Sequence, residues 1–190
     1  MKAPSLKSAL LALLCAALAA SAVAAPAEVI LIRHGEKPED GPTLNARGYA
    51  RARALPRLFE TDARVLAFGR AVALFSARPA KAGGSVRSIE TLDPTAKALG
   101  LAIDTRFTKD DIAALVRAVL TNPAYDGKTV LVCWEHKKIP GIVRAFGWAG
   151  APAGWNDAVF DRLWILDFDG AKPVRFRDLP QRLLPGDSGS

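Results

Sequence analysis

The strongest constraint on the fold comes from two apolar runs in which polar residues do not alternate with apolar ones. Residues 28–32 read Glu-Val-Ile-Leu-Ile, and residues 129–134 read Thr-Val-Leu-Val-Cys-Trp. A strand with one solvated face alternates apolar and polar residues, whereas a strand covered on both faces is apolar almost throughout. Both runs therefore predict central strands of a sheet that is covered on each face.

Helical patterns separate these runs from further strand-like segments. We expect helices over 44–54, 88–99, 110–120 and 139–146, and strands over 71–75, 101–103, 162–168 and 173–179. Pro56 should end or restart the first helix, Pro94 should break the second, and Gly100 should stop it. Asp169-Gly170 is typical of a hairpin turn. The alternation of strands and helices predicts an α/β domain, a three-layer sandwich with a mostly parallel central sheet.

The first 25 residues have the layout of a secretory signal peptide. Lys2 and Lys7 precede an apolar run over 9–20, and the small residues Ala22-Val23-Ala24-Ala25 follow it as a cleavage site. An uncleaved membrane anchor is the alternative, but the run is short for a membrane span. We therefore expect a secreted or periplasmic protein with no stable membrane insertion after cleavage of the signal.

One domain over residues 26–184 is expected after the signal, followed by a flexible tail over 185–190. The chain has 26 Lys and Arg residues against 19 Asp and Glu residues, for a formal net charge of +7. This balance would suit nucleic acid, an acidic membrane surface or an anionic substrate, but a basic solvated surface is the favoured interpretation. The sequence has no block of Lys and Arg and no interleaving of aromatic with basic residues, so nucleic acid is not an expected partner.

The whole chain contains two histidines, and each follows one of the two apolar runs. His34 comes directly after Arg33, and His136 comes directly after Glu135. In open α/β sheets, ligands bind outside the carboxyl ends of the strands. Two scarce titratable groups at equivalent strand ends therefore indicate one shared site.

Basic residues near the same expected sheet edge indicate what this site binds. Arg33, Lys37 and either Arg78 or Arg87 belong to that edge, and Gly35 would let the backbone approach a ligand closely. Arginine binds phosphate through a planar fork of donors, and a cluster of fixed cations favours an anion over a metal ion. A neutral imidazole among arginines can attack phosphorus to form a phosphohistidine. These residues therefore predict a phosphate pocket.

The sequence resembles the histidine phosphatase superfamily, also called phosphoglycerate mutase-like, in four stretches that occur in the same order. They are the signature Arg-His-Gly-Glu at 33–36, the first-helix pattern at 44–52, the Ser, Arg and Thr stretch at 75–91, and the second-histidine strand at 130–136. Together they cover most of residues 27–147. The resemblance implies a phosphoglycerate mutase-like fold, a phosphatase that needs no metal and no cofactor, and a small phosphorylated substrate.

The resemblance also implies a role for individual residues. His34 would be the phosphorylated nucleophile, and Arg33 and Arg87 would bind the phosphoryl group. His136 would bind the same group and stabilise the transition state. Arg87 is preferred to Arg78 because it stands at the head of the helix, as the family pattern requires.

The chain departs from the family just before the second histidine. The family has Gly there, whereas this sequence reads Trp134-Glu135-His136. The family also uses an acidic residue to protonate the leaving group. Glu135 is the first candidate, although its side chain would point away from His136 if the strand continued. Asp110 and Asp111 are alternatives that also suit the first turn of a helix.

The favoured hypothesis is an exported phosphatase that hydrolyses phosphate monoesters through a phosphohistidine on His34. A non-catalytic phosphate- or anion-binding domain of the same fold is the alternative, because the proton donor is not assigned. A metal-dependent hydrolase that uses His34, His136, Glu36 and Glu135 is a third hypothesis. These residue types are valid metal ligands, but the neighbouring arginines argue against it.

Overall fold

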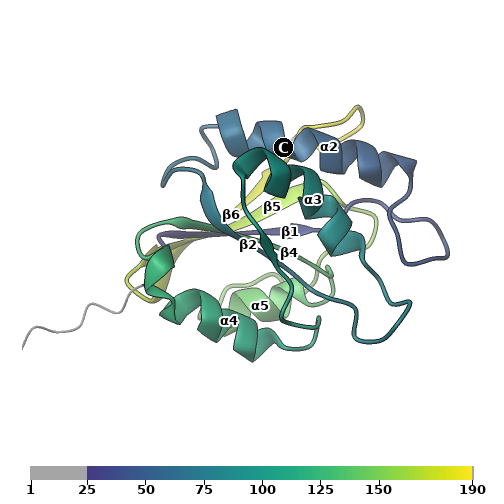
Figure 1. Ribbon diagram of the computed structural model, residues 1–190. Coiled ribbons are helices and arrows are strands. Elements are labelled where there is room, and N and C mark those ends of the chain that lie inside the picture. The colour runs from purple at the N-terminus through teal and green to yellow at the C-terminus, as the bar shows by residue number, and fades with distance from the viewer. Residues whose placement is uncertain (1–24, 190) are drawn as a thin grey trace, which may run out of the picture.

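The computed structural model describes residues 25–189, so the predicted signal peptide lies outside the described residues apart from Ala25 (Figure 1). Six strands form one sheet in the order β3-β2-β4-β1-β5-β6. Their bounds are β1 Glu28–Arg33, β2 Ala71–Ser76, β3 Ile103–Asp104, β4 Thr129–Trp134, β5 Arg162–Asp169 and β6 Lys172–Pro180. The first four strands are parallel, and β5 and β6 form an antiparallel hairpin.

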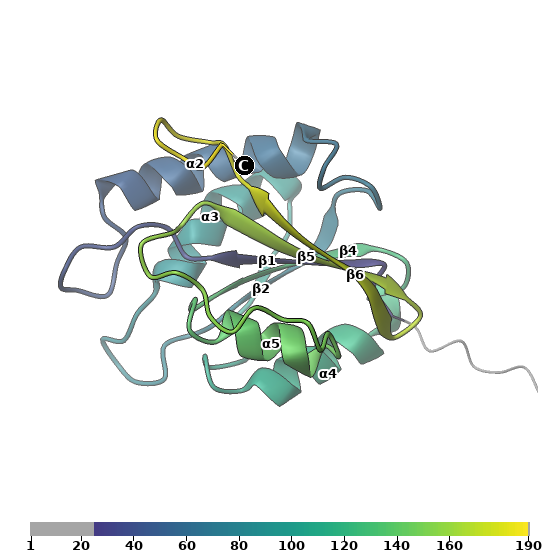
Figure 2. The same cartoon turned by 180° about the vertical axis from the view of Figure 1, so that it is seen from behind.

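Four α-helices pack on this sheet. Their bounds are α2 Ala46–Thr61, α3 Arg87–Leu99, α4 Ile112–Thr121 and α5 Ile139–Ala145, and a short 3₁₀ helix spans Pro123–Tyr125. Helices α2 and α3 cover one face of the sheet, and α4 and α5 cover the other (Figures 1 and 2). The three-layer α/β fold predicted from the sequence is confirmed. Within residues 25–189, no helix is long and apolar enough to cross a membrane.

The predicted helix breaks at Pro56 and Pro94 are wrong, because α2 and α3 continue through both prolines. A proline inside a helix loses one backbone hydrogen bond and costs about 3 kcal/mol. Apolar side chains on both sides of each proline are buried against the sheet and offset this cost: Leu55, Leu58 and Phe59 in α2, and Leu92 and Ala96 in α3. Gly100 ends α3 in the left-handed conformation, as predicted.

The hydrophobic core has two halves, one on each face of the sheet. Val29 and Leu31 of β1 belong to the half under α4 and α5, whereas Ile30 and Ile32 belong to the half under α2 and α3. Successive side chains of a strand point to opposite faces, so a strand between two helical layers needs an apolar residue at every position. This requirement explains the uninterrupted apolar runs in the sequence.

Residues 185–189, where the sequence predicts a flexible tail, make side-chain contacts with the folded domain. The carboxylate of Asp187 accepts hydrogen bonds from the guanidinium of Arg51 in α2, at 2.8 and 2.9 Å. The backbone N–H groups of Leu183 and Leu184 donate to the same carboxylate. Residue 190 lies outside the described residues.

Arg51 connects Glu36, which lies in the loop after β1, to this C-terminal segment. Its side chain is 1% exposed and also donates to Glu36, with an Nη2–Oε1 distance of 2.7 Å. We expect Arg51→Ala to lower the free energy of unfolding by about 3–5 kcal/mol, because the carboxylates of Glu36 and Asp187 then keep only the half-exposed Arg47 as a charged partner among residues 25–189. Urea denaturation measures this loss.

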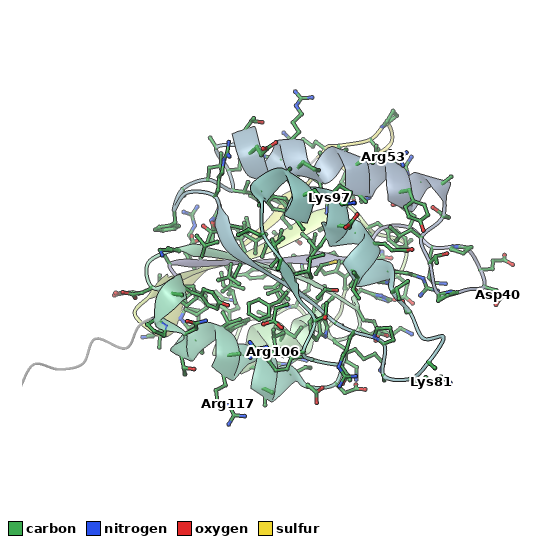
Figure 3. The ribbon with its side chains drawn as sticks, viewed as in Figure 1. Asp40, Arg53, Lys81, Lys97, Arg106 and Arg117 are labelled. Carbon is green, nitrogen blue, oxygen red and sulfur yellow. The ribbon has the colours of Figure 1, made fainter. Side chains whose placement is uncertain are left out.

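Arg53 provides a matched control, because it lies on the same helix with an exposed side chain (Figure 3). Arg53→Ala should change the free energy of unfolding by no more than about 0.5 kcal/mol. If Arg51→Ala lowers the free energy of unfolding no more than Arg53→Ala does, the buried network does not stabilise the fold.

Candidate active site

The carboxyl ends of β1 and β4 meet at one edge of the sheet. The two strands are parallel and in register up to Arg33 and Trp134, and the backbone N–H of His34 donates to the carbonyl of Trp134. The residues that follow each strand therefore lie together. His34 and His136 line one pocket of about 420 Å³ at this edge.

Four of the five predicted site residues line this pocket: His34, His136, Arg87 and Glu135. Arg33 is not among the lining residues, although it precedes His34 directly. The loops after β1 and β2 extend beyond this edge of the sheet, and Figure 3 labels one residue in each, Asp40 and Lys81.

The protonation of His34 is set by its surroundings. The side chain is 6% exposed, and Nδ1 lies 2.7 Å from the carbonyl oxygen of Gly35. A carbonyl can only accept, so Nδ1 carries the proton and Nε2 keeps its lone pair. Burial lowers the pKa of His34 to about 4, and the positive charges of Arg33 and Arg87 act in the same direction. His34 is therefore a neutral base at neutral pH.

Backbone packing leaves little room for a side chain at Gly35. A Cβ at Gly35 would lie 3.0 Å from the backbone of Gly48, and a Cβ at Gly48 would lie 2.2 Å from the carbonyl oxygen of Glu36. The chain after β1 thus passes against the first turn of α2, where neither position has room for a side chain. Thr91 of α3 accepts a hydrogen bond from the Gly35 N–H at 2.9 Å. These contacts fix the backbone on either side of His34.

Arg33 is buried beneath a loop that the sequence did not connect with it. Its Nη1 donates to the carbonyl oxygens of Asp157 at 2.7 Å and Val159 at 2.9 Å, and lies 3.4 Å from that of Asn156. The guanidinium carbon stands 3.7 Å from the ring centroid of Phe160. Burial lowers the pKa of Arg33 to about 10, so it stays charged at neutral pH. Its Nε is buried and has no hydrogen-bond partner among the described residues.

His136 is held by a residue from the same loop. Its Nε2 lies 2.8 Å from Oδ1 of Asp157, a carboxylate that accepts the hydrogen bond. This bond lowers the pKa of Asp157, while burial and the charge of Arg33 lower the pKa of His136. Asp157 was not identified from the sequence, because no motif surrounds it and α5 separates it from His136 along the chain.

Glu135 faces the same pocket as His136. The opposite orientation expected of a continued strand does not occur, because β4 ends at Trp134. The nearest cation to Glu135 is Lys109, with an Oε2–Nζ distance of 3.7 Å. Oε2 is also buried and has no hydrogen-bond partner among the described residues. An acidic group with an unused oxygen therefore lies in the wall of the pocket.

The alternative proton donors Asp110 and Asp111 lie outside the lining of the pocket, whereas the two candidate arginines belong to it. Asp110 pairs with Lys138, and Asp111 accepts from Thr108; neither aspartate lines the pocket. Arg87 begins α3 and donates to the carbonyls of Gly41 and Thr43, whereas Arg78 is exposed. Both arginines line the pocket.

In the described part of the chain, no three metal-ligating side chains form a group that could hold a metal ion.

The two histidines of the chain allow a direct test of the ionisation of His34. We expect its ring protons to titrate in NMR spectra with a midpoint near pH 4, because burial disfavours the imidazolium. Since the folded-state pKa is the lower one, the free energy of unfolding should fall as the pH drops from about 6.5 toward 4. A His136→Gln variant leaves one histidine and assigns the signal. A midpoint near 6.5 would contradict the neutral buried state.

No protein-family model and no curated protein sequence matches the chain. Solved structures do match. The alpha-ribazole phosphatase from Shigella flexneri is 13% identical with a TM-score of 0.55, and the match covers 85% of this chain and 100% of that one.

Two further structures show the same likeness. A mycobacterial glucosyl-3-phosphoglycerate phosphatase is 14% identical with a TM-score of 0.52, over 80% of this chain and 97% of that one. A phosphoglycerate mutase from Plasmodium falciparum is 16% identical with a TM-score of 0.51, over 86% and 96%. The chain therefore has the phosphoglycerate mutase-like α/β fold that its sequence motifs predict.

Proposed function

We propose that this protein is a metal-independent phosphatase that hydrolyses phosphate monoesters through a phosphohistidine on His34. The observation that carries the proposal is the state of His34: a neutral imidazole with its Nδ1 proton bound to Gly35 and its Nε2 lone pair unused, in a pocket lined by basic side chains. The solved structures of this fold include proteins named as phosphatases, which agrees with the proposal.

The first chemical step is transfer of the phosphoryl group to the histidine. Nε2 of His34 attacks phosphorus while the bond from phosphorus to the ester oxygen breaks. Glu135 gives its proton to the departing oxygen, so that an alcohol leaves. Arg87 and His136 line the pocket and bind the non-bridging oxygens.

Hydrolysis of the phosphohistidine completes the cycle. A water molecule gives a proton to Glu135 and attacks phosphorus, the N–P bond breaks, and inorganic phosphate leaves with His34 neutral again. The net reaction converts one ester and one water into one alcohol and one phosphate. A phosphoryl oxygen that binds His136 Nε2 must compete with the carboxylate of Asp157, which accepts from that nitrogen in the free protein.

The setting of this activity is also part of the proposal. The charged, apolar and small-residue segments over 1–25 support export, which makes the substrate an extracytoplasmic phosphate ester. After cleavage of the signal peptide, the domain over 26–184 carries out the reaction.

Removal of the nucleophile tests the function. His34→Ala should lower phosphate release from 4-nitrophenyl phosphate by at least about 10³-fold, because no other group can accept the phosphoryl group. A far-UV circular dichroism spectrum like that of the wild type and a cooperative urea transition would show that the variant is folded. The wild-type protein, quenched in turnover with a ³²P-labelled ester, should carry an acid-labile and base-stable phosphoryl label that the variant lacks.

Three results would contradict the proposed phosphatase. Full activity of His34→Ala would exclude the histidine as nucleophile. Tight binding of phosphate by the wild type, with no labelled protein and no phosphate release, would show a non-catalytic anion-binding domain. Activity that disappears with EDTA and returns with a divalent metal would show a metal-dependent hydrolase.

The role of Glu135 is tested by changing the leaving group. Glu135→Gln should lower kcat/KM for glycerol phosphate about 10²- to 10³-fold, because an alkoxide needs a proton as it leaves. The same variant should lose far less activity with 4-nitrophenyl phosphate, whose leaving group is stable as an anion. Asp110→Asn serves as the control, since Asp110 does not line the pocket. If Asp157→Asn shows this leaving-group dependence and Glu135→Gln does not, Asp157 is the donor.

A further inference from the structure

The pocket around His34 carries more positive charge than a single phosphoryl group requires. Six Lys and Arg side chains line it and one carboxylate does, that of Glu135. The six are Lys37, Arg78, Lys81, Arg87, Lys109 and Lys137. One ester phosphate brings at most two negative charges. In the proposed mechanism, Arg87 and His136 already bind it.

Most of these cations are not held in ion pairs within residues 25–189. Lys109 lies near two carboxylates, those of Asp110 at 3.2 Å and Glu135 at 3.7 Å. Lys37, Arg78, Lys81 and Lys137, here called the rim cations, form no ion pair with any residue of 25–189. By contrast, the partly or fully buried arginines of α2 and β6 lie against carboxylates. The rim cations are therefore available to a ligand.

The rim cations come from three chain segments that the parallel sheet brings to one edge. Lys37 follows β1, Arg78 and Lys81 follow β2, and Lys137 follows β4. All four are exposed, and Figure 3 shows Lys81 in the loop between β2 and α3. Like charges gathered in one pocket repel one another, and an anion that enters the pocket relieves this repulsion.

We propose that the substrate carries a second anionic group, a phosphate or a carboxylate, which binds the rim cations while its scissile phosphate sits at His34. This inference rests on the proposed phosphatase function, because it takes His34 as the place of the scissile group. The pocket volume of about 420 Å³ lies within the range of small-molecule sites, about 300–1,000 Å³. The substrate class is therefore a small polyanionic phosphate ester, such as a nucleoside or sugar bisphosphate.

Paired ligands that differ by one phosphate test this proposal. The probes are adenosine 5′-monophosphate against adenosine 3′,5′-bisphosphate, and glucose 6-phosphate against glucose 1,6-bisphosphate. Calorimetry with the His34→Ala protein measures their binding without turnover, and His34→Asn is the second background if the alanine variant does not fold. We expect at least one bisphosphate to bind about tenfold or more tightly than its monophosphate, since exposed cations each add a modest attraction.

Two triple variants that remove the same charge show whether the rim cations cause the difference in affinity between bisphosphate and monophosphate. The rim variant combines Lys37→Gln, Lys81→Gln and Lys137→Gln, and it should bring the bisphosphate-to-monophosphate affinity ratio close to one. The control combines Lys97→Gln, Lys128→Gln and Lys172→Gln, which removes the same charge at exposed positions that do not line the pocket. The control should keep the ratio of the parent protein. Equal affinities within both ligand pairs, or an unchanged ratio in the rim variant, would overturn the proposal.

Turnover by the wild-type protein separates this proposal from the function on which it rests. If no ester releases phosphate and no phosphohistidine forms, the phosphatase proposal fails, while the affinity ratio still decides whether the pocket selects polyanions. If the esters are hydrolysed but the ratio is one, the phosphatase stands and the second anionic group is excluded.

Discussion

The parallel pairing of β1 with β4 is the constraint on which the rest of the structure depends. Both strands are buried along their whole length and lie in register, so the chain leaves the sheet at the same level after Arg33 and after Trp134. The two histidines of the chain follow these ends and meet in one pocket. A shift of either strand by one residue would turn apolar side chains out of their layer and separate the histidines.

Burial of charged and polar groups is what gives the pocket its chemistry. His34 is kept neutral because it is removed from water and surrounded by cations. Arg33 remains charged under the loop over 156–160, held by backbone carbonyls and the ring of Phe160. The same loop supplies Asp157 to His136. One buried arginine thus connects the end of β1 to a distant loop, and both histidines depend on that arrangement.

The order of strands and helices, the buried runs and the hairpin at Asp169-Gly170 were predictable, because they depend on periodicity and local turn chemistry. The breaks assigned to Pro56 and Pro94 were not correct, since the local cost of a proline is outweighed by burial that only the packed layers reveal. The contacts of Asp187 were not predictable for a similar reason. Its partner, Arg51, is distant in the chain, and no local pattern indicates such a pair.

By itself, the sequence determined the α/β class, the two central strands and the chemical identity of the groups at their ends, because uninterrupted apolar runs admit few other folds. Only the tertiary structure decided that Gly35 packs against Gly48, that Glu135 lines the pocket, and that Asp157 holds His136. These outcomes depend on contacts between segments far apart in the chain. Such contacts are selected by packing and charge pairing, which leave no local signal in the order of the residues.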